Sequence, residues 1–271
     1  MSDAGAPRPG LRVAVLGANG RMGRAVVRLA SEAGMKVVCA VGVDDVGRDA
    51  GEVAGIGAIG TKIVSDMTAA VGGIAQSGAE LLIDFSAPVA LAHAAAVCAA
   101  SGIAIVSGTT GIGEAAESAL DDAAASCAVL WEPNMSVGVH VLASLVQKAM
   151  AALGPAFDVE VVEVHHRKKA DAPSGTALRL GDVVKNARAG SHYVHGREGR
   201  PGPRQADEVG MHAVRGGDVV GDHTVFFFGE GERIELTHRA SSRDLFAHGA
   251  VRAARWLRGK PPGRYQLAEM L

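Results

Sequence analysis

The chain has 271 residues, a formal net charge of −2 at pH 7 and a pI near 6.6, so it offers no bulk attraction to nucleic acid or to an anionic membrane. With 48% hydrophobic and 21% charged residues, it can bury a full core and is long enough for two domains. The three cysteines are widely spaced and form no CxxC pair, which argues against a disulfide framework and a zinc knuckle: they are Cys39, Cys98 and Cys127.

The N-terminal segment does not resemble a targeting signal, because its first ten residues lack the apolar core of a signal peptide. The longest apolar-looking stretch, residues 87–106, is rich in alanine and is broken by His93, Ser101 and Gly102. A helix followed by a strand accounts for this stretch better than a membrane span does. We therefore expect a soluble, cytoplasmic protein with no membrane and no nucleic-acid partner.

The N-terminal half alternates short apolar runs with segments of helical length and composition. Apolar runs of this kind are typical of parallel strands that are buried on both faces. The repeated β-α-β order predicts an α/β fold with a doubly wound, Rossmann-like parallel sheet. We predict strands at residues 13–16, 37–41, 81–85, 103–106 and 128–131, and helices at residues 21–33, 87–100 and 114–126.

The residue pattern changes after residue 157. From there on, segments alternate apolar with polar residues or are rich in β-branched and aromatic residues. These segments predict a second, α+β domain built on an open mixed sheet, with strands at residues 159–166, 211–214, 222–228 and 233–238. One strand contains three consecutive phenylalanines, Phe226 to Phe228, and so has apolar groups on both faces. We therefore expect a subunit interface there.

Two further segments complete the predicted organisation. Residues 195–207, rich in Gly, Pro and Arg, predict a mobile flap, and residues 243–258 predict a helix that returns to the first domain. The expected division is a dinucleotide-binding domain made of residues 1–135 and 243–271, and a substrate-binding and oligomerisation domain made of residues 136–242.

A glycine-rich turn follows the first predicted strand. Gly17, Gly20 and Gly23 allow a tight turn, close approach of the backbone to a pyrophosphate, and close packing of helix on strand. The spacing is G-x-x-G-x-x-G rather than the commoner G-x-G-x-x-G, so a tight turn without a ligand stays open as the alternative. A ribose-binding acid is usual at the end of the second strand, but here Asp44 comes slightly late, and Arg21 could serve a 2′-phosphate instead. The preference between NADH and NADPH therefore stays open.

Two other turns occupy equivalent positions after predicted parallel strands. Residues 108–111 (GTTG) and residues 131–136 (WEPNMS) would both lie at the carboxyl edge of the sheet, where ligands bind in this architecture. The alternatives are an ordinary turn for the first segment and a helix cap by Asn134 or Ser136 for the second.

The most informative stretch is residues 163–176, EVHHRKKADAPSGT. It combines two imidazoles, three cations and a predicted helix start, where free backbone amides bind anions. A histidine near a cation and an anionic ligand can act as an acid at neutral pH. Zinc binding by His165 and His166 is disfavoured, because adjacent residues on an extended chain point to opposite faces and no further ligand is near. We expect no metal; a purely structural histidine pair remains the alternative.

These residues carry a resemblance to a known family. The segment EVHHRKKADAPSGTA (residues 163–177) is similar to the E-x-H-H-x-x-K-x-D-x-P-S-G-T-A signature of the 4-hydroxy-tetrahydrodipicolinate reductase (dihydrodipicolinate reductase) family. Residues 17–23, 108–111, 134–138 and 237–243 resemble further family segments in the same order, and the resemblance runs over nearly the whole chain.

The resemblance implies hydride transfer from NADH or NADPH to a cyclic dicarboxylate in the diaminopimelate route to lysine. It implies that His165 donates the proton, that Lys169 assists, and that His166, Gly175 and Thr176 hold the substrate carboxylates. It implies a homotetramer joined through the sheet of the second domain. The implied cofactor contacts are Gly17, Ala18, Asn19, Gly20, Arg21, Met22, Gly108, Thr109, Thr110, Glu132, Pro133, Asn134 and Met135, with Asp44 as a candidate ribose contact.

The chain also departs from the family pattern. Many members carry Glu, often followed by Arg, at the end of the second strand, whereas this chain has Gly42 and Val43. Glu132 stands where small residues are common. Two other classes of protein remain as alternatives: a different two-domain NAD(P)-dependent dehydrogenase, against which the His-His…Lys cluster argues, and a non-enzymatic nucleotide sensor, which would have no need of both His165 and Lys169.

Overall fold

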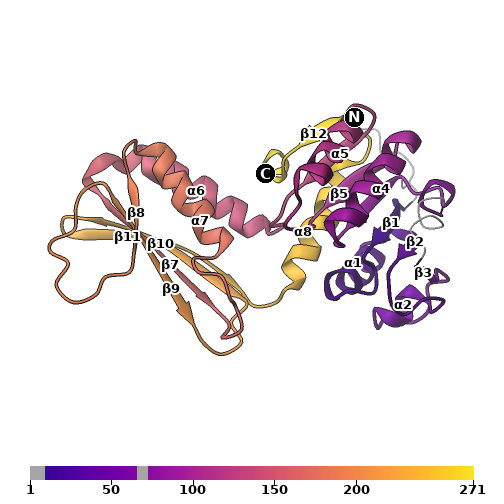
Figure 1. Ribbon diagram of the computed structural model, residues 1–271, viewed down its shortest axis with the longest axis horizontal. Helices are drawn as coiled ribbons and strands as arrows, with labels where there is room; N and C mark the ends of the chain where they lie inside the picture. Colours follow the sequence, from indigo (N-terminus) through magenta and orange to yellow (C-terminus); the bar gives the residue numbers. More distant parts are fainter. Residues whose placement is uncertain (1–9, 66–72) are drawn as a thin grey trace, which may run out of the picture. The chain divides into compact units, whose positions relative to one another are not determined.

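A computed structural model describes residues 10–65 and 73–271 (Figure 1). The chain divides into two compact units. The first comprises the described residues up to Met135 together with Asp244–Leu271, and the second comprises Ser136–Arg243. Each unit has its own sheet and its own core, so each is described by itself.

Unit 1 is built on a seven-stranded sheet in the order β12-β6-β5-β4-β1-β2-β3, and every neighbouring pair in it is parallel. The middle strands are almost completely buried because helices cover both faces. The strands are β1 (Arg12–Leu16), β2 (Lys36–Val41), β3 (Ile63–Val64), β4 (Leu81–Asp84), β5 (Ala104–Ser107), β6 (Ala128–Trp131) and β12 (Gly263–Tyr265).

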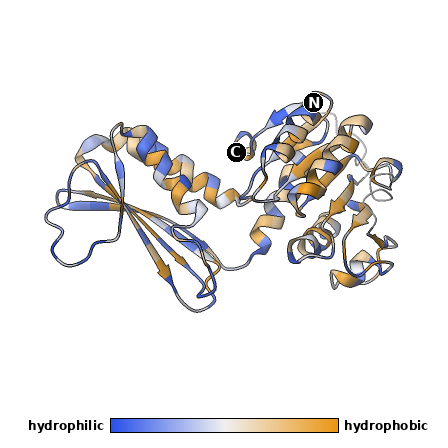
Figure 2. Cartoon of the chain, in the orientation of Figure 1, coloured by the Kyte–Doolittle hydropathy of each residue, from blue (hydrophilic) through white to orange (hydrophobic). Residues whose placement is uncertain are grey.

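Alternate residues of β1 belong to two separate cores, one on each face of the sheet. Val13 and Val15 pack with α1 (Arg21–Glu32) and α8 (Asp244–Leu257). Ala14 and Leu16 pack with α4 (Pro88–Ser101) and α5 (Glu114–Ala124). The short helices of the unit include α2 (Ala50–Val53) and the 3₁₀ helix η2 (Leu267–Met270). The hydropathy colouring shows the apolar strands inside these helical layers (Figure 2).

The predicted Rossmann-like sheet is confirmed, including its topological switch point. Chain order runs outward from β1 in both directions, through β2 and β3 on one side and through β4, β5 and β6 on the other. Ligands bind outside the carboxyl ends of the strands at such a point. The apolar stretch of residues 87–106 is a helix followed by a strand, as predicted.

Unit 2 is built on a five-stranded mixed sheet in the order β11-β10-β7-β9-β8. Pairs β7–β9 and β8–β9 are parallel, and pairs β10–β11 and β10–β7 are antiparallel. Side chains from one face pack with the two helices in a single core. The elements are α6 (Val137–Leu153), η1 (Gly154–Ala156), β7 (Asp158–His165), α7 (Gly175–Ala187), β8 (His192–His195), β9 (Glu208–Arg215), β10 (Gly221–Gly229) and β11 (Glu232–Ala240).

Helix α6 and its 3₁₀ extension form the longest apolar segment among the described residues. By length and composition, Val137–Ala156 could cross a membrane, with a mean hydropathy of 1.4 over its most apolar window. Core helices of soluble proteins pass the same test. Val146 and Met150 of this helix are buried in the core of unit 2, as are Val159 and Val161 of the adjacent strand.

The three phenylalanines of β10 divide between the two faces of the sheet, since side chains alternate along a strand. Phe227 is fully buried in the core on the helical face. Phe226 and Phe228 lie on the other face, where their rings stack with centroids 5.6 Å apart and Phe228 is 38% exposed. The predicted subunit interface at this strand stays a prediction.

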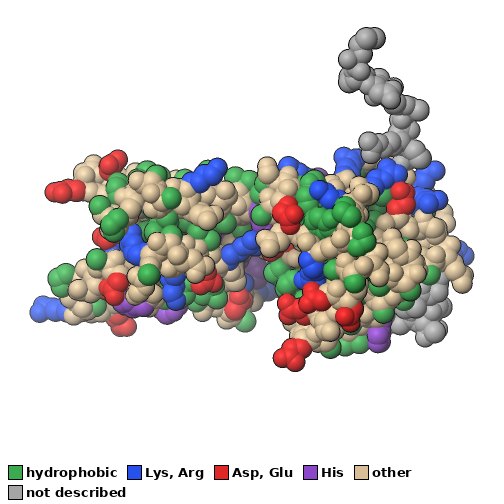
Figure 3. Space-filling view, turned by 90° about the horizontal axis from the view of Figure 1, so that it is seen from above, with side chains coloured by type: hydrophobic (Ala, Val, Ile, Leu, Met, Phe, Trp, Pro, Cys, Tyr) green, Lys and Arg blue, Asp and Glu red, His purple; other side chains and the backbone are tan. Residues whose placement is uncertain are grey.

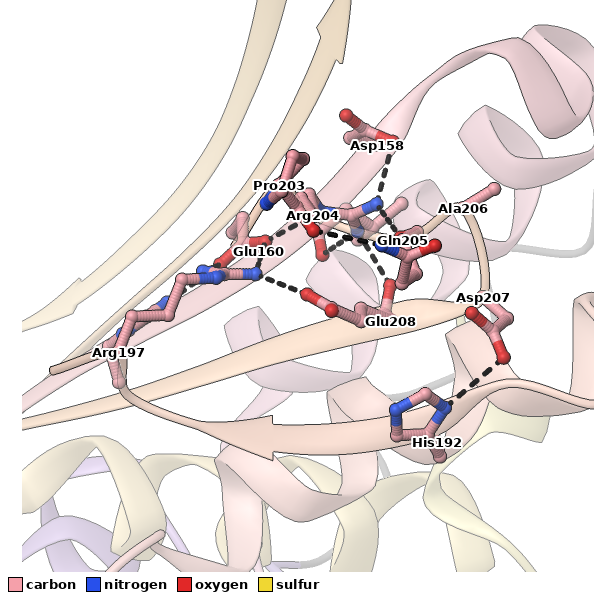
Figure 4. Close-up of polar contacts among 12 residues, drawn as sticks. Asp158, Glu160, His192, Arg197, Pro203, Arg204, Gln205, Ala206, Asp207 and Glu208 are labelled. Atoms are coloured by element: carbon pink, nitrogen blue, oxygen red, sulfur yellow. Dashed lines mark hydrogen bonds and ion pairs between the residues drawn. The ribbon is translucent and has the colours of Figure 1, made fainter. Parts of the chain in front are cut away.

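The segment between β8 and β9 is tied to the centre of the sheet. Arg197 donates two hydrogen bonds, of 2.9 and 3.0 Å, to the carboxylate of Glu160 on β7 (Figure 4). Arg204 donates a third, of 3.0 Å, and Nε2 of His212 lies 2.7 Å from the same carboxylate. The predicted mobile flap stays a prediction, although two of its arginines form ion pairs with a buried acid.

The described surface mixes both signs of charge. In the space-filling view, Lys and Arg alternate with Asp and Glu over the face shown, without a continuous basic stripe on that face (Figure 3).

Candidate active site

The glycine turn after β1 has the conformation that close packing requires. Gly17 has a φ of +81°, and a Cβ there would collide with the carbonyl of Phe85. A Cβ on Gly23 would collide with the carbonyl of Gly17. The backbone amides of Gly17 and Ala18 both donate to the carbonyl of Val41, at 2.9 and 2.8 Å. The turn is therefore locked between the ends of β1, β2 and β4.

The start of α1 fits an anionic group. Its N-cap is Gly20, which has no side chain to satisfy the first amides of the helix, and its first turn contains no acidic residue. Arg21 is exposed there and forms no ion pair with any residue of the described ranges. A helix start without its own cap is suited to a phosphate. Met22 is half-buried and packs against the core.

The departure from the family pattern at position 42 has a structural reason. Asn19 folds over the end of β2, where its Oδ1 accepts a hydrogen bond from the amide of Val43 at 3.2 Å. Its Nδ2 donates to Asp44 at 3.4 Å. A Cβ on Gly42 would collide with the Asn19 side chain. Asn19 thus occupies the space that a side chain at position 42 would need, and Asp44 remains exposed beside the glycine turn.

The ends of β4 and β5 are joined by a fully buried carboxylate, Asp84, whose role the sequence did not suggest. Its Oδ2 accepts hydrogen bonds from Ser107 Oγ and Thr109 Oγ1, both at 2.6 Å. Its Oδ1 accepts from Ser86 Oγ at 2.5 Å and from the Ser86 amide at 3.0 Å. Burial raises the pKa of Asp84, although these hydrogen bonds oppose the shift. The only local signal was an aspartate ending an apolar strand.

This network makes Thr109 a structural residue. Its hydroxyl is bonded to Asp84 and to the Ser86 amide, and its amide donates to Ser107 Oγ at 3.3 Å. Its carbonyl accepts from Trp131 Nε1 at 2.9 Å. The side chain is 3% exposed, whereas that of the next residue, Thr110, is exposed. Of the two threonines predicted to contact the cofactor, only Thr110 presents its side chain outward.

The segment after β6 also divides into inner and outer residues. Glu132 is 8% exposed, and its amide donates to the carbonyl of Ser107 at 3.0 Å. Met135 is 1% exposed and belongs to the core of unit 1, with its carbonyl against Gly249. Pro133 is exposed and Asn134 is half-buried. The predicted contact of Met135 with the cofactor stays a prediction, and its side chain points into the core.

In unit 2, His165 ends β7 and is held by a buried acid on the same strand. Its Nδ1 lies 2.5 Å from Oε2 of Glu163, whose side chain is 1% exposed. Arg215 on β9 donates to both oxygens of Glu163, at 2.7 and 2.8 Å, and the amide of Ser174 donates to Oε1 at 3.1 Å. Burial raises the pKa of Glu163, but the bonds from Arg215 and His165 outweigh it and leave the pKa lowered.

A second histidine lies against the first. The ring of His223 meets that of His165 edge-to-face with centroids 5.1 Å apart, and its Nε2 lies 3.0 Å from Ser174 Oγ. Burial, together with the nearby His165, lowers the pKa of His223 to about 4. His223 is therefore neutral at pH 7. It lies 58 positions from His165 in the sequence, and no motif around it indicated a role in the site.

The residues that were predicted to bind an anion come directly after β7 in the chain. His166 is half-buried, and its Nε2 lies 3.3 Å from a guanidinium nitrogen of Arg243. Lys169 is in a turn in which its amide donates to the carbonyl of His166 at 3.1 Å. Its ammonium contacts both carboxylate oxygens of Asp171, at 2.8 and 2.9 Å. The cations of this cluster are thus gathered within one turn after β7.

Helix α7 begins at the same place. Ser174 is its N-cap, with Oγ accepting a hydrogen bond from the amide of Ala177 at 3.1 Å. Gly175 is exposed, Thr176 is half-buried, and the first turn contains no acidic residue. Because Glu163 binds both the Ser174 amide and His165, the helix start and the imidazole share one anchor. Among the described residues, no group of three or more His, Cys, Asp or Glu is arranged to hold a metal ion.

Fold and site together define a class of protein: a two-unit α/β nucleotide-dependent reductase with an acid–base and anion-binding cluster in its second unit. A family model for the N-terminus of dihydrodipicolinate reductase matches residues 11–135, and one for its C-terminus matches residues 138–271. The chain therefore belongs to the dihydrodipicolinate reductase family, a family of oxidoreductases that use a pyridine nucleotide.

Curated relatives agree with this assignment. The chain is 47% identical over 267 residues to the 4-hydroxy-tetrahydrodipicolinate reductase of Alkalilimnicola ehrlichii, and the aligned region covers 96% of this chain and 98% of the relative. It is 48% identical over 267 residues to the 4-hydroxy-tetrahydrodipicolinate reductase of Anaeromyxobacter dehalogenans, which covers 96% and 97%.

Solved structures share the fold. A dipicolinate-bound dihydrodipicolinate reductase from Paenisporosarcina sp. TG-14 has a TM-score of 0.75 at 23% identity, covering 97% of this chain and 100% of that one. An amine dehydrogenase from Mycobacterium smegmatis has a TM-score of 0.67 at 13% identity, covering 95% of each chain. At these identities the likeness extends to the architecture alone.

Proposed function

We propose that this protein reduces 4-hydroxy-tetrahydrodipicolinate (dihydrodipicolinate) to tetrahydrodipicolinate, with NADH or NADPH, in the diaminopimelate route to lysine. Its membership of the family and its 47% identity to a curated reductase support this assignment. The observation that carries the proposed chemistry is the orientation of His165, which a buried carboxylate holds by Nδ1 beside a cluster of cations and an exposed helix start.

His165 is the proposed proton donor. Its Nε2 forms no hydrogen bond with any of the described residues. This nitrogen is not completely buried, so it is accessible to solvent. A histidine imidazole within reach of a substrate carbon can act as a general acid. In the proposed reaction the ring gains a hydride at one carbon and a proton from Nε2 at the neighbouring carbon, and the hydroxylated form of the substrate also loses water.

The substrate carboxylates are proposed to bind at the turn after β7. Lys169 and His166 supply a cation and a polar imidazole, and the amides of Gly175 and Thr176 lie at the uncharged first turn of α7. These groups also stabilise the electron density that builds up in the ring before it is protonated. Fixed donors of this kind contribute roughly 3 kcal/mol each to lowering a barrier.

Unit 1 is the proposed nucleotide-binding unit. The glycine turn and the uncapped start of α1 fit a pyrophosphate, and Thr110, Pro133 and Asn134 lie outward at the same carboxyl edge of the sheet. When bound, the reduced nicotinamide supplies the hydride. Thr109 and Met135 support this edge from inside, through the Asp84 network and the core respectively.

We further propose that the protein is a cytoplasmic homotetramer and that unit 2 provides its subunit interface. The stacked pair Phe226 and Phe228, on the face of the sheet opposite to α6 and α7, supports this proposal. Size-exclusion chromatography with light scattering tests it, since a Phe226→Ser, Phe228→Ser variant should lose the tetramer.

The reductase assignment is tested by measuring NADH and NADPH oxidation from nicotinamide absorbance. A coupling synthase would generate the unstable substrate in place from pyruvate and aspartate semialdehyde. Oxidation of either nucleotide that depends on both precursors supports the proposal and ranks the two cofactors. Nucleotide binding without any oxidation would reject it and would favour the sensor alternative.

A further inference from the structure

Three hydrogen-bond donors converge on Glu163, the most deeply buried acid of unit 2. Glu163 and His165 are two positions apart on β7, so their side chains point to the same face of the sheet. In the parallel pairing of β7 with β9, His165 lies opposite Arg215, whose guanidinium reaches back to Glu163. The backbone amide of Ser174 completes the set.

This arrangement decides which nitrogen of His165 carries its fixed proton. Oε1 of Glu163 accepts from Ser174 and Arg215, and Oε2 accepts from Arg215, so the acid is held as a carboxylate that can only accept. Nδ1 of His165, 2.5 Å from Oε2, must then be the donor. The exchangeable proton of the imidazole is consequently the one on Nε2.

Arg215 has a separate effect on charge. The proposed substrate is a dicarboxylate, and an isolated carboxylate at Glu163 would repel it. The two-bonded contact of Arg215 with Glu163 neutralises that acid, so the Arg215–Glu163 pair has no net charge beside the binding cluster. Glu163 therefore orients the imidazole, and Arg215 cancels the repulsion that the charge of Glu163 would exert on the substrate.

We propose that Glu163 and Arg215 are positioning residues for the reaction: Glu163 holds His165 with Nδ1 as donor and Nε2 as the proton-transferring atom, and Arg215 neutralises Glu163 toward the dianionic substrate. This inference rests on the proposed function. It assigns different kinetic effects to the two residues, which a purely structural ion pair would not.

The two effects separate in a double-mutant cycle. Glu163→Gln should lower kcat by roughly 10²-fold or more, because the acid catalyst loses its tautomer, while the Kd for pyridine-2,6-dicarboxylate should not weaken, since Arg215 is left as an uncompensated cation. Arg215→Met should weaken that Kd by about tenfold, since Glu163 becomes an uncompensated charge, whereas Arg215→Lys should retain binding. The double variant Glu163→Gln, Arg215→Met should recover binding without recovering kcat.

A spectroscopic experiment tests the tautomer of His165 without the need to measure enzyme activity. Solid-state ¹⁵N NMR of histidine-labelled protein, with His165→Gln to assign the signal, should show His165 protonated at Nδ1 in the wild type and altered in Glu163→Gln. Glu160→Gln is the matched control, because Glu160 is a second buried glutamate on β7 that bonds Arg197, Arg204 and His212 instead. It should leave the His165 signal and kcat unchanged.

The outcomes distinguish the inference from the reductase assignment. Retained kcat in Glu163→Gln, a wild-type His165 with a proton on Nε2 and none on Nδ1, or a double variant that binds no better than Arg215→Met would each overturn the positioning role. A wild type that oxidises neither nucleotide would reject the proposed function, while the NMR arm would still decide how Glu163 acts on His165. If Arg215→Met does not fold, Glu163→Gln and the NMR arm decide the outcome.

Discussion

The ammonium of Lys169 lies 2.8 and 2.9 Å from the two carboxylate oxygens of Asp171, so the cation proposed to bind the substrate already holds an internal acid. The side chain of Asp171 is 61% exposed, whereas that of Lys169 is only 20% exposed. The hydrogen bond from Lys169 lowers the pKa of Asp171, so this carboxylate is charged at neutral pH. A substrate carboxylate would therefore compete with an exposed protein carboxylate for the same cation.

Replacing Asp171 should strengthen the binding of anionic ligands. An exposed ion pair contributes about 0.2–1 kcal/mol, so Asp171→Asn should lower the Kd of pyridine-2,6-dicarboxylate by roughly two- to fivefold in calorimetry. Glu198→Gln, which removes an exposed acid from the same unit, is the control for net charge. Equal Kd values for wild type and Asp171→Asn would show that Lys169 does not bind the ligand.

The nucleotide turn should be intolerant of a single methyl group. A Cβ on Gly23 would collide with the carbonyl of Gly17, so Gly23→Ala should cost about 1–3 kcal/mol of unfolding free energy and weaken nucleotide binding. Denaturant titration measures the first effect and nucleotide fluorescence the second. Gly113→Ala, where a Cβ would have no neighbour within 4 Å, is the matched control. Similar losses in both variants would contradict the close-packing argument.

Asp44 should discriminate against a 2′-phosphate. It is exposed beside the glycine turn, where Asn19 holds it, and a carboxylate there repels an added phosphate. Asp44→Asn should therefore lower the KM for NADPH more than the KM for NADH, whichever nucleotide the wild type prefers. Steady-state kinetics with both nucleotides test this prediction. An unchanged ratio of the two KM values would mean that Asp44 does not face the ribose.

Glu160 should control the acid stability of unit 2. Burial raises the pKa of Glu160, but the hydrogen bonds from Arg197, His212 and Arg204 prevail and lower the pKa to about 2. A lowered native pKa stabilises the fold above the ordinary value of 4.5, and this contribution is lost as the pH falls from 4.5 toward 2. The shift corresponds to no more than about 3.5 kcal/mol.

The matched variant is Glu160→Gln, which removes the titration. Its unfolding free energy should depend less steeply on pH between 4.5 and 2 than that of the wild type, as followed by circular dichroism in urea. Parallel curves for the two proteins over that range would show that another acid controls the transition.

Sequence patterns located most of the framework of this fold. The strands of unit 1 are short apolar runs bounded by turns. Such runs are expected because a strand that is buried on both faces needs apolar side chains at nearly every position. The strand Ala128–Trp131 was predicted to the residue. In contrast, β12 and β8 were missed, because Gly263–Tyr265 and His192–His195 are short edge strands with little apolar content.

The proposed catalytic and anion-binding residues could be recognised in one contiguous segment of the sequence. The residues that hold them in place could not. His165, His166 and Lys169 are close in sequence, so their proximity needed no knowledge of the fold. Arg215 is 52 positions from Glu163, and Thr109 is 25 positions from Asp84. Contacts of that kind depend on which strands are neighbours, and a single sequence gives no register for the pairing. For the same reason the burial of Thr109 and Met135 was not foreseen.

The most direct test of the account is the rate of nucleotide oxidation by His165→Gln under saturating substrate. His93→Gln is the control, since His93 is an exposed histidine on α4, remote in sequence from the site. We expect kcat to fall by roughly 10²–10⁴-fold in His165→Gln, with the Kd for pyridine-2,6-dicarboxylate nearly unchanged, and to stay at the wild-type value in His93→Gln. A His165→Gln protein that turns over as fast as the wild type would contradict the assignment of His165 as the proton donor.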